Sequence, residues 1–167
     1  MPMWNSLQNT ATVNLTYHPF GIAQCQKQND GIKCQCQHGN QECIMNQLQA
    51  CVIAALEVPQ LYMRVVNCIQ GKRDINKAMG ECIVNARPRP DLDERFIQNC
   101  AQSQLGAKLM YQHGQRQHKI ARDLNWVPWI MVNGAREQKA EISMNYVLCK
   151  FASLSSSQYC QQSDDNI

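Results

Sequence analysis

Features that mark several common functional classes are missing from this chain of 167 residues. No apolar run approaches the roughly 18 to 20 residues needed to cross a bilayer, which excludes a membrane-spanning role. The net charge of +3 is too small to point to nucleic acid. The N-terminus has neither a basic start nor an apolar run, so it does not form a signal peptide. With no internal repeat, we expect one domain over residues 1–160 and a polar tail at 161–167.

A C-x-x-C pair, the usual motif of thiol–disulfide oxidoreductases, is also missing, because no two of the ten cysteines stand three residues apart. The number of cysteines is nevertheless high, and such a density is typical of oxidising compartments, where disulfides persist. Asn14 begins an Asn-Leu-Thr acceptor sequence for N-glycosylation, which indicates the same route. The sequence therefore predicts a disulfide-stabilised protein of the secretory pathway.

The first half of the chain combines one strand, one loop and a helix. Residues 13–17 alternate between apolar and polar side chains, which predicts a strand. Residues 25–39 have no periodicity and are predicted to be a loop held by covalent links. Apolar residues then recur at helical offsets from 45 to 56, which predicts a helix that Pro59 ends. Cys51 falls on the apolar face of this helix and should point inward.

Helices are predicted over 61–69, 74–85 and 91–111. The last can be capped by Asp91, which places Leu92, Phe96 and Cys100 on one face. The β-branched run around 130–132 predicts a strand, and Asn133-Gly134 is typical of a hairpin turn. A helix from 141 to about 151 should close the fold. Strands separated by a long helical stretch indicate an α/β fold.

The stretch from Cys36 to Cys51 reads C-Q-H-G-N-Q-E-C-I-M-N-Q-L-Q-A-C. It resembles the signature of the gamma-interferon-inducible lysosomal thiol reductase family. The resemblance implies a thioredoxin-like sheet with a helical insertion and reduction of protein disulfides in an acidic compartment. A small thiol would be the electron donor, and no other cofactor is implied.

In this family the reactive C-x-x-C pair precedes the signature, at the end of the first strand and on the helix that follows it. Residues 1–8 resemble only the tail of that helix. The resemblance therefore implies a thioredoxin-like domain in which the first strand and the start of the active-site helix are missing. Because neighbouring strands would lose their hydrogen-bond partners, we expect an incomplete chain rather than an intact fold.

The resemblance also assigns roles to individual residues. Val127 and Pro128 match the position of a cis-proline that faces the reactive pair in thioredoxin-like proteins, where the preceding residue binds the substrate chain like an added strand. Eight cysteines fall where the family usually has them and are expected to be structural, while Cys25 and Cys34 are additional. The eight are Cys36, Cys43, Cys51, Cys68, Cys82, Cys100, Cys149 and Cys160. Spacing alone does not decide their pairing.

Cys34 and Cys36 are the candidate catalytic residues that remain in this sequence, because a C-x-C pair can form an easily reduced disulfide. The alternative is that Cys36 pairs structurally while Cys34 links to Cys25 or stays free. A zinc site with His38 is disfavoured by the ligand spacing. His113 and His118 lie in a polar, Gln-rich segment that predicts a solvated helix end.

The function predicted for the complete protein is reduction of disulfide-containing protein substrates by a small thiol, in a lysosomal or secreted location. This chain by itself is predicted to be of doubtful activity, since it lacks the reactive pair. The alternative is a secreted, disulfide-stapled binding protein that keeps the scaffold without the reaction. Neither function calls for a metal, a nucleic acid or a membrane.

Overall fold

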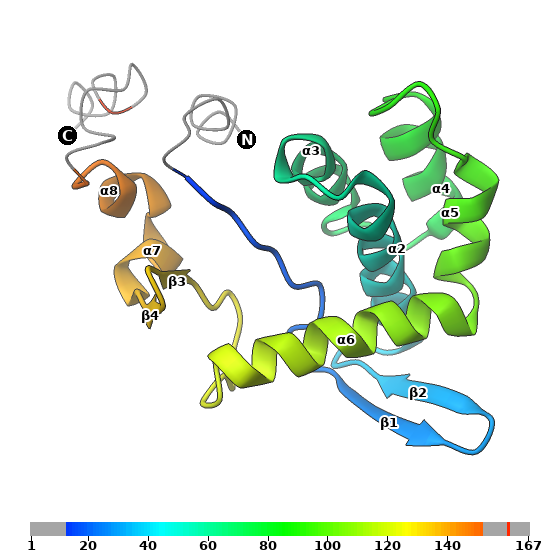
Figure 1. Cartoon of the computed structure of the whole chain (residues 1–167), viewed down its shortest axis with the longest axis horizontal. Coiled ribbons are helices and arrows are strands. Elements are labelled where there is room, and N and C mark those ends of the chain that lie inside the picture. The colour runs from blue at the N-terminus through cyan, green and yellow to red at the C-terminus, as the bar shows by residue number, and fades with distance from the viewer. Residues whose placement is uncertain (1–12, 152–159, 161–167) are drawn as a thin grey trace. The chain divides into compact units, whose positions relative to one another are not determined.

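The computed structural model describes residues 13–151 and residue 160. The predictions for the helix tail at 1–8 and the polar tail at 161–167 lie outside these residues. The chain divides into two compact units, Thr16–Asn125 on the one hand and Met1–Leu15 with Trp126–Ile167 on the other. Helices and two small antiparallel sheets make up the described part (Figure 1), which agrees with an α/β class. Both described sheets are two-stranded, so the thioredoxin-like arrangement stays a prediction.

The unit Thr16–Asn125 is built around one long helix. Its helices are α2 (Asn40–Leu56), α3 (Pro59–Ile69), α4 (Ile75–Met79), the π-helical turn η1 (Gly80–Val84), α5 (Glu94–Ala101) and α6 (Gln104–Ile120). Helix α2 packs against α3, α5 and α6, so its apolar residues lie in the core. Leu48, Val52 and Leu56 are almost fully buried, which confirms the predicted helical face. Pro59 opens α3, where a missing backbone N–H has no cost.

The predicted helix 91–111 is wrong as a single element, because the chain breaks at Gln102 and Ser103 between α5 and α6. The residue that caps α5 is Asp93 rather than Asp91, since the Asp93 side chain accepts a hydrogen bond from the Phe96 backbone N–H. Cys100 is buried as part of the core, whereas Phe96 is 52% exposed and Ile97 takes the buried position beside it. The predicted apolar face is therefore correct at Cys100 and wrong at Phe96.

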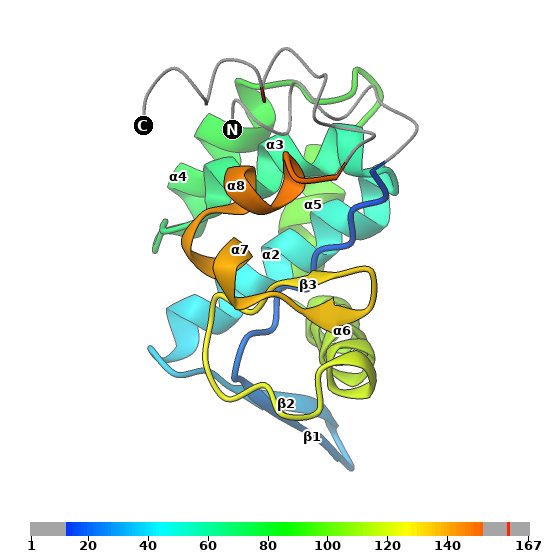
Figure 2. The same cartoon turned by 90° about the vertical axis from the view of Figure 1, so that its left-hand side faces the viewer.

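The predicted loop at 25–39 is also wrong, because most of it forms a hairpin of β1 (Gln24–Gln28) and β2 (Gly31–Gln35). Its strands carry several glutamines exposed to solvent, so they lack the apolar alternation that marks a half-buried strand. Figures 1 and 2 both place the hairpin beside α6. Gln104 makes the connection, because its Oε1 atom accepts a hydrogen bond of 2.7 Å from the Ile32 backbone N–H.

The second unit contains the hairpin of β3 (Met131–Val132) and β4 (Ala135–Arg136), followed by α7 (Gln138–Ile142) and α8 (Met144–Leu148). Asn133 and Gly134 form the turn with positive φ angles of 50° and 84°, which confirms the predicted hairpin signal. The predicted helix from 141 to about 151 is interrupted at Ser143. That residue has an extended backbone, and its hydroxyl caps α8 by accepting from the Tyr146 backbone N–H.

The strand predicted at 13–17 is not formed, since no β-strand is assigned to these residues. Alternation of apolar and polar side chains indicates which way each residue faces. It does not supply the neighbouring strand whose backbone groups a strand needs for hydrogen bonding.

Candidate functional site

All ten cysteines lie in the described residues, and all are paired in five disulfides. The eight cysteines expected to be structural close four bridges among themselves, Cys36–Cys43, Cys51–Cys100, Cys68–Cys82 and Cys149–Cys160. The two additional cysteines form the fifth bridge, Cys25–Cys34. Cys34 and Cys36 thus have different partners, and the structure corrects the idea that they form one C-x-C disulfide.

The signature segment forms a closed turn at the start of α2. The Cys36–Cys43 bridge spans it, and the Gly39 backbone N–H donates to the Cys36 carbonyl at 3.2 Å. Gly39 has a φ of 88°, a left-handed conformation that favours glycine over residues with a side chain. A residue with a side chain at position 39 would strain this turn.

Glu42 holds the same turn from within the first turn of α2. Its Oε2 atom accepts a hydrogen bond of 2.6 Å from the His38 backbone N–H and lies 3.1 Å from His38 Nδ1. The carboxylate also lies near the positive end of the helix dipole, which stabilises a negative charge there. The His-Gly turn and the acidic residue of the signature are therefore explained by local structure and do not require catalysis.

His38 is engaged with Glu42 and does not gather a set of ligands with the nearby cysteines, which are bonded to one another. Within 13–151 and 160, no cluster of three or more His, Cys, Asp or Glu side chains is arranged to hold a metal ion.

The remaining bridges of the helical unit tie its helices together. Cys51 on α2 is bonded to Cys100 on α5, and both are buried, as predicted for Cys51. Cys68 on α3 is bonded to Cys82 in η1. These bonds fix the packing of α2, α3 and α5 around the core.

The predicted substrate-binding residues Val127 and Pro128 lie in the other unit, and both are exposed. Their peptide bond is cis, as the sequence predicted. Trp126, directly before them, is 53% exposed. The segment thus presents an aromatic ring, a valine and a proline to solvent immediately before β3.

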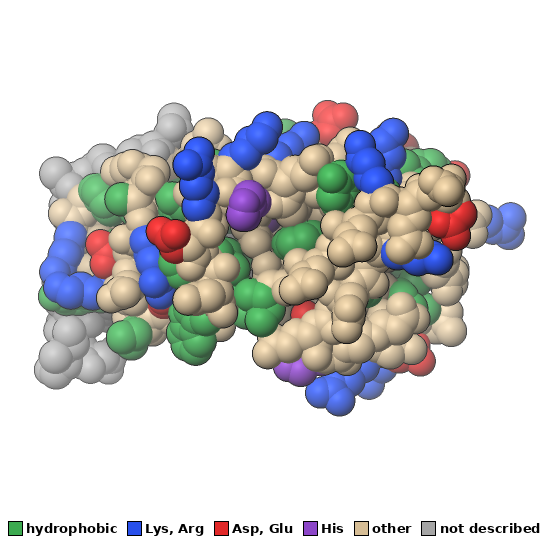
Figure 3. Space-filling model, turned by 90° about the horizontal axis from the view of Figure 1, so that it is seen from below, with side chains coloured by type: hydrophobic (Ala, Val, Ile, Leu, Met, Phe, Trp, Pro, Cys, Tyr) green, Lys and Arg blue, Asp and Glu red, His purple; other side chains and the backbone are tan. Residues whose placement is uncertain are grey.

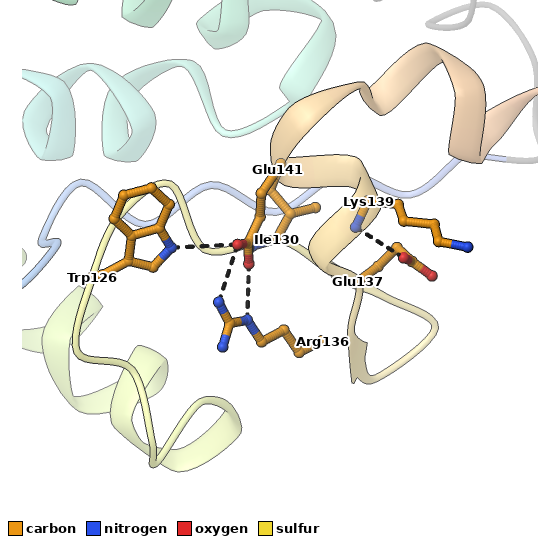
Figure 4. A network of polar contacts seen from close by, with 6 residues as sticks. All are labelled: Trp126, Ile130, Arg136, Glu137, Lys139 and Glu141. Atoms are coloured by element: carbon orange, nitrogen blue, oxygen red, sulfur yellow. Dashed lines mark hydrogen bonds and ion pairs between the residues drawn. The ribbon is translucent and has the colours of Figure 1, made fainter.

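A polar network anchors this segment from α7 (Figure 4). Glu141 accepts hydrogen bonds of 2.9 and 3.1 Å from the Arg136 guanidinium, and the Trp126 indole N–H donates to its Oε2 atom at 3.3 Å. The Ile130 backbone N–H lies 3.5 Å from Oε1 of the same carboxylate. The Arg136 guanidinium in turn stacks 3.7 Å from the centre of the Trp129 ring. Sequence analysis did not identify Glu141, because its partners are set by the fold of the loop.

The hydrogen bond from Arg136 holds the pKa of Glu141 below its ordinary value, and the Trp126 N–H acts in the same direction. The same bond raises the pKa of Arg136. Both groups therefore remain charged into mildly acidic solution, and the anchor of the Trp126–Pro128 segment is retained there.

A histidine pair in the helical unit was not foreseen. His113 on α6 is 7% exposed rather than solvated as predicted, and its Nδ1 atom lies 3.0 Å from Nδ1 of His18. Burial lowers the pKa of His113 to about 4, and the nearby His18 and Arg116 act in the same direction. The two histidines are 95 residues apart, so no local pattern could have revealed the pair.

The residues after His18 dock on the same face of α6. A Cβ atom built on Gly114 would lie 2.4 Å from the ring of Phe20, so the glycine makes room for that ring. The Gln117 amide donates a hydrogen bond of 2.7 Å to the Gly21 carbonyl.

The predicted glycosylation residue Asn14 is exposed.

Comparison with known proteins places these features in one family. The family model for "Gamma interferon inducible lysosomal thiol reductase (GILT)" matches residues 1–86. A GILT-like protein of Caenorhabditis elegans is 41% identical over 152 residues, which cover 89% of this chain and 68% of that protein. A GILT-like protein of Caenorhabditis briggsae is 40% identical with the same coverage.

The gamma-interferon-inducible lysosomal thiol reductase of Mus musculus is 31% identical over 133 residues, which cover 79% of this chain and 51% of the mouse protein. The sequence thus spans about two thirds of the two nematode relatives and about half of the mouse protein.

Among the helices that the structure describes, none is long and apolar enough to span a bilayer.

Proposed function

The chain belongs to the gamma-interferon-inducible lysosomal thiol reductase family, and from this premise we propose that the protein in its complete form reduces disulfides of protein substrates. A small thiol supplies the electrons, and the reaction takes place in an acidic or secretory compartment. The observation that carries this proposal is the similarity to a mouse protein that is named a lysosomal thiol reductase. The five disulfides agree with an oxidising route of biosynthesis.

In this proposal the described residues bind the substrate and brace the scaffold. Val127 and Pro128 hold the substrate main chain next to the bond to be cleaved, and Glu141 fixes the orientation of their loop. The exposure of Val127 and Trp126 leaves this segment open to an extended peptide. In this proposal the dithiol that reduces protein substrates is not among the ten cysteines, because none of them belongs to a C-x-x-C motif.

The pairing of all ten cysteines also favours a second function. A scaffold that exposes a peptide-binding segment but carries only closed disulfides can act as a secreted binding protein without turnover. This alternative and the reductase make opposite predictions for the complete protein.

An insulin-reduction assay with a small thiol at about pH 5 separates the two, because free insulin B chain precipitates and is followed by turbidity. We expect turnover by the product of the complete gene, and binding of a disulfide-containing peptide without turnover by the chain of 167 residues. Failure of the complete product to accelerate reduction above the thiol alone would overturn the reductase and favour the binding protein. Turnover by the shorter chain that is lost in Cys34→Ser would instead place the reaction within these ten cysteines.

A further inference from the structure

One of the five disulfides differs from the rest in the exposure of its two cysteines. Each of the other four contains at least one cysteine that is 7% exposed or less, whereas both Cys25 and Cys34 are half-buried. Thiol–disulfide exchange requires that an attacking thiolate reach a sulfur atom along the bond. In each of the other four bridges at least one of the two cysteines is buried, whereas Cys25–Cys34 is open to attack from either end.

The position of this bridge on the hairpin supplies a nearby positive charge. Cys25 on β1 is paired directly with Cys34 on β2, and two positions along the ladder Lys27 is paired with Ile32. Because side chains on a strand alternate between faces, Lys27 shares a face with both sulfur atoms. Its ammonium group lies over the Tyr111 ring of α6, 5.8 Å from the ring centre. A cation so placed stabilises a thiolate that forms at Cys25.

A hollow in the surface is lined by Cys34 but not by Cys25. Its volume is about 560 Å³, within the range of roughly 300 to 1,000 Å³ typical of small-molecule sites. Half of its ten lining residues carry amide or hydroxyl side chains, namely Asn40, Gln47, Gln102, Ser103 and Gln104. Lys33 is the one charged residue of the lining. Figure 3 views the molecule from the hairpin side, where uncharged side chains and backbone cover most of the hairpin region and charges lie towards the rim.

We propose that Cys25–Cys34 is a reversible exchange site for a small peptide thiol that carries carboxylates, and that the hollow beside Cys34 binds this thiol. Amide groups of the lining bind the peptide groups of the thiol. Lys33, which in this structure forms an exposed ion pair of 3.4 Å with Asp30, exchanges this partner for a carboxylate of the thiol. This ligand class also accounts for a hollow with no acidic residue in its lining.

The exchange proceeds in two balanced steps. The thiolate of the first small thiol attacks Sγ of Cys34, which forms a mixed disulfide and breaks the bond to Cys25. Cys25 leaves as a thiolate, stabilised by Lys27. A second small thiol then attacks the mixed disulfide, releases the Cys34 thiolate and forms the oxidised small thiol. Two thiols are oxidised, and one protein disulfide is reduced. The site is independent of the proposed reductase function, because it requires neither a C-x-x-C pair nor a protein substrate.

Glutathione is the probe for the first experiment. The oxidised full chain is incubated with rising glutathione concentrations at pH 7.5, quenched by alkylation at successive times and mapped by mass spectrometry. We expect Cys25 to be alkylated first, Cys34 to carry glutathione at early times, and the opening rate to saturate with glutathione concentration. Prior opening of any other bridge, glutathione found mainly on Cys25, or a strictly linear rate would each overturn the proposal. Insulin turnover is measured separately and does not bear on this result.

Charge variants test the two lysines in the same assay. Lys27→Gln should lower the limiting rate about threefold, because the Cys25 thiolate becomes a poorer leaving group. Lys33→Gln should instead raise the half-saturating glutathione concentration and leave the limiting rate unchanged. Lys119→Gln, an exposed lysine at the end of α6, is the matched control and should change neither quantity. Equal effects of all three substitutions would show that only net charge matters and would overturn the assigned roles.

Discussion

The Nδ1 atoms of His18 and His113 lie 3.0 Å apart, which requires one ring to donate a proton and the other to accept it. A pair with both rings protonated has no acceptor and carries two positive charges beside Arg116. Burial opposes the charged form as well and lowers the pKa of both histidines. The contact that joins the segment before β1 to α6 is therefore stable in its neutral form.

The pair should make stability depend on pH below about 6.5. An unfolded histidine takes up a proton as the pH falls through this value, whereas folded His113 stays neutral until the pH approaches its pKa of about 4. Stability is therefore lost on acidification, by about 1 to 2 kcal/mol between pH 7 and pH 5 from His113. Urea unfolding of the wild type and of His113→Gln at both pH values measures this difference.

The variant should lose most of that pH dependence, while His118→Gln, at an exposed position of the same helix, should keep it. An unchanged slope in His113→Gln would contradict the assignment. The five disulfides offset part of this loss, because they restrain the unfolded chain at every pH.

Gly114→Ala should destabilise the helical unit, although alanine is normally favoured over glycine in a helix. The added methyl group would lie 2.4 to 2.7 Å from three atoms of the Phe20 ring. Displacing that ring from α6 should lower the free energy of unfolding by about 1 to 3 kcal/mol. Gly80→Ala is the control, because a Cβ there meets nothing within 4 Å, and it should be neutral or stabilising by up to about 1 kcal/mol. Thermal unfolding followed by circular dichroism compares them, and equal effects would refute the role of the Phe20 contact.

Helix α2 could be predicted from the sequence because its signal is local and strong. Apolar residues at helical spacing are buried as expected, and the Asn133-Gly134 turn follows from backbone preferences of two residues. The hairpin at Gln24–Gln28 and Gly31–Gln35 could not be predicted in the same way. Its stability comes from a cross-strand disulfide and from Gln104 on α6, and the strands bury too little apolar surface to show alternation.

The residues of the candidate sites likewise include some that the sequence predicts and some that it does not. The cis bond before Pro128 was predictable from a family pattern, whereas the carboxylate of Glu141 that anchors its loop was not. His113 was mistaken for a solvated residue because its polar neighbours in sequence say nothing about His18. Non-local polar contacts are specified by tertiary structure, and a single sequence gives no measure of them.

Glu42→Ala should weaken the start of α2. The substitution removes the acceptor of the His38 backbone N–H and a negative charge at the helix N-terminus. We expect a loss of about 1 to 2 kcal/mol in the free energy of unfolding, typical of a hydrogen bond to a charged group. Glu94→Ala, in the first turn of α5, is the matched control and should cost less, because no hydrogen bond or ion pair is described for its side chain. Urea titrations that rank the two in the opposite order would exclude this function of Glu42.

Glu141→Gln should weaken peptide binding by the Trp126–Pro128 segment without unfolding the helical unit. Glutamine does not provide the two negatively charged acceptors for Arg136, and the loop loses its anchor. The affinity for a disulfide-containing peptide, measured by isothermal titration calorimetry, should fall. Glu137→Gln serves as the control, because the Glu137 side chain accepts a hydrogen bond from the Lys139 backbone N–H and makes none of the contacts to Arg136 or Trp126. Unchanged affinity in Glu141→Gln would argue that the loop does not bind the peptide.

Removing the Cys51–Cys100 bridge should cost more stability than removing Cys25–Cys34. The first closes a separation of 49 residues and the second one of 9, and the entropy that a disulfide takes from the unfolded chain grows with loop length. This gives about 4 and about 3 kcal/mol. Burial increases this difference in lost stability, because the double alanine variant of Cys51 and Cys100 also leaves a cavity between α2 and α5. Guanidinium unfolding of the two double variants tests this order, and a smaller loss for Cys51 and Cys100 would mean that α2 and α5 pack without the bridge.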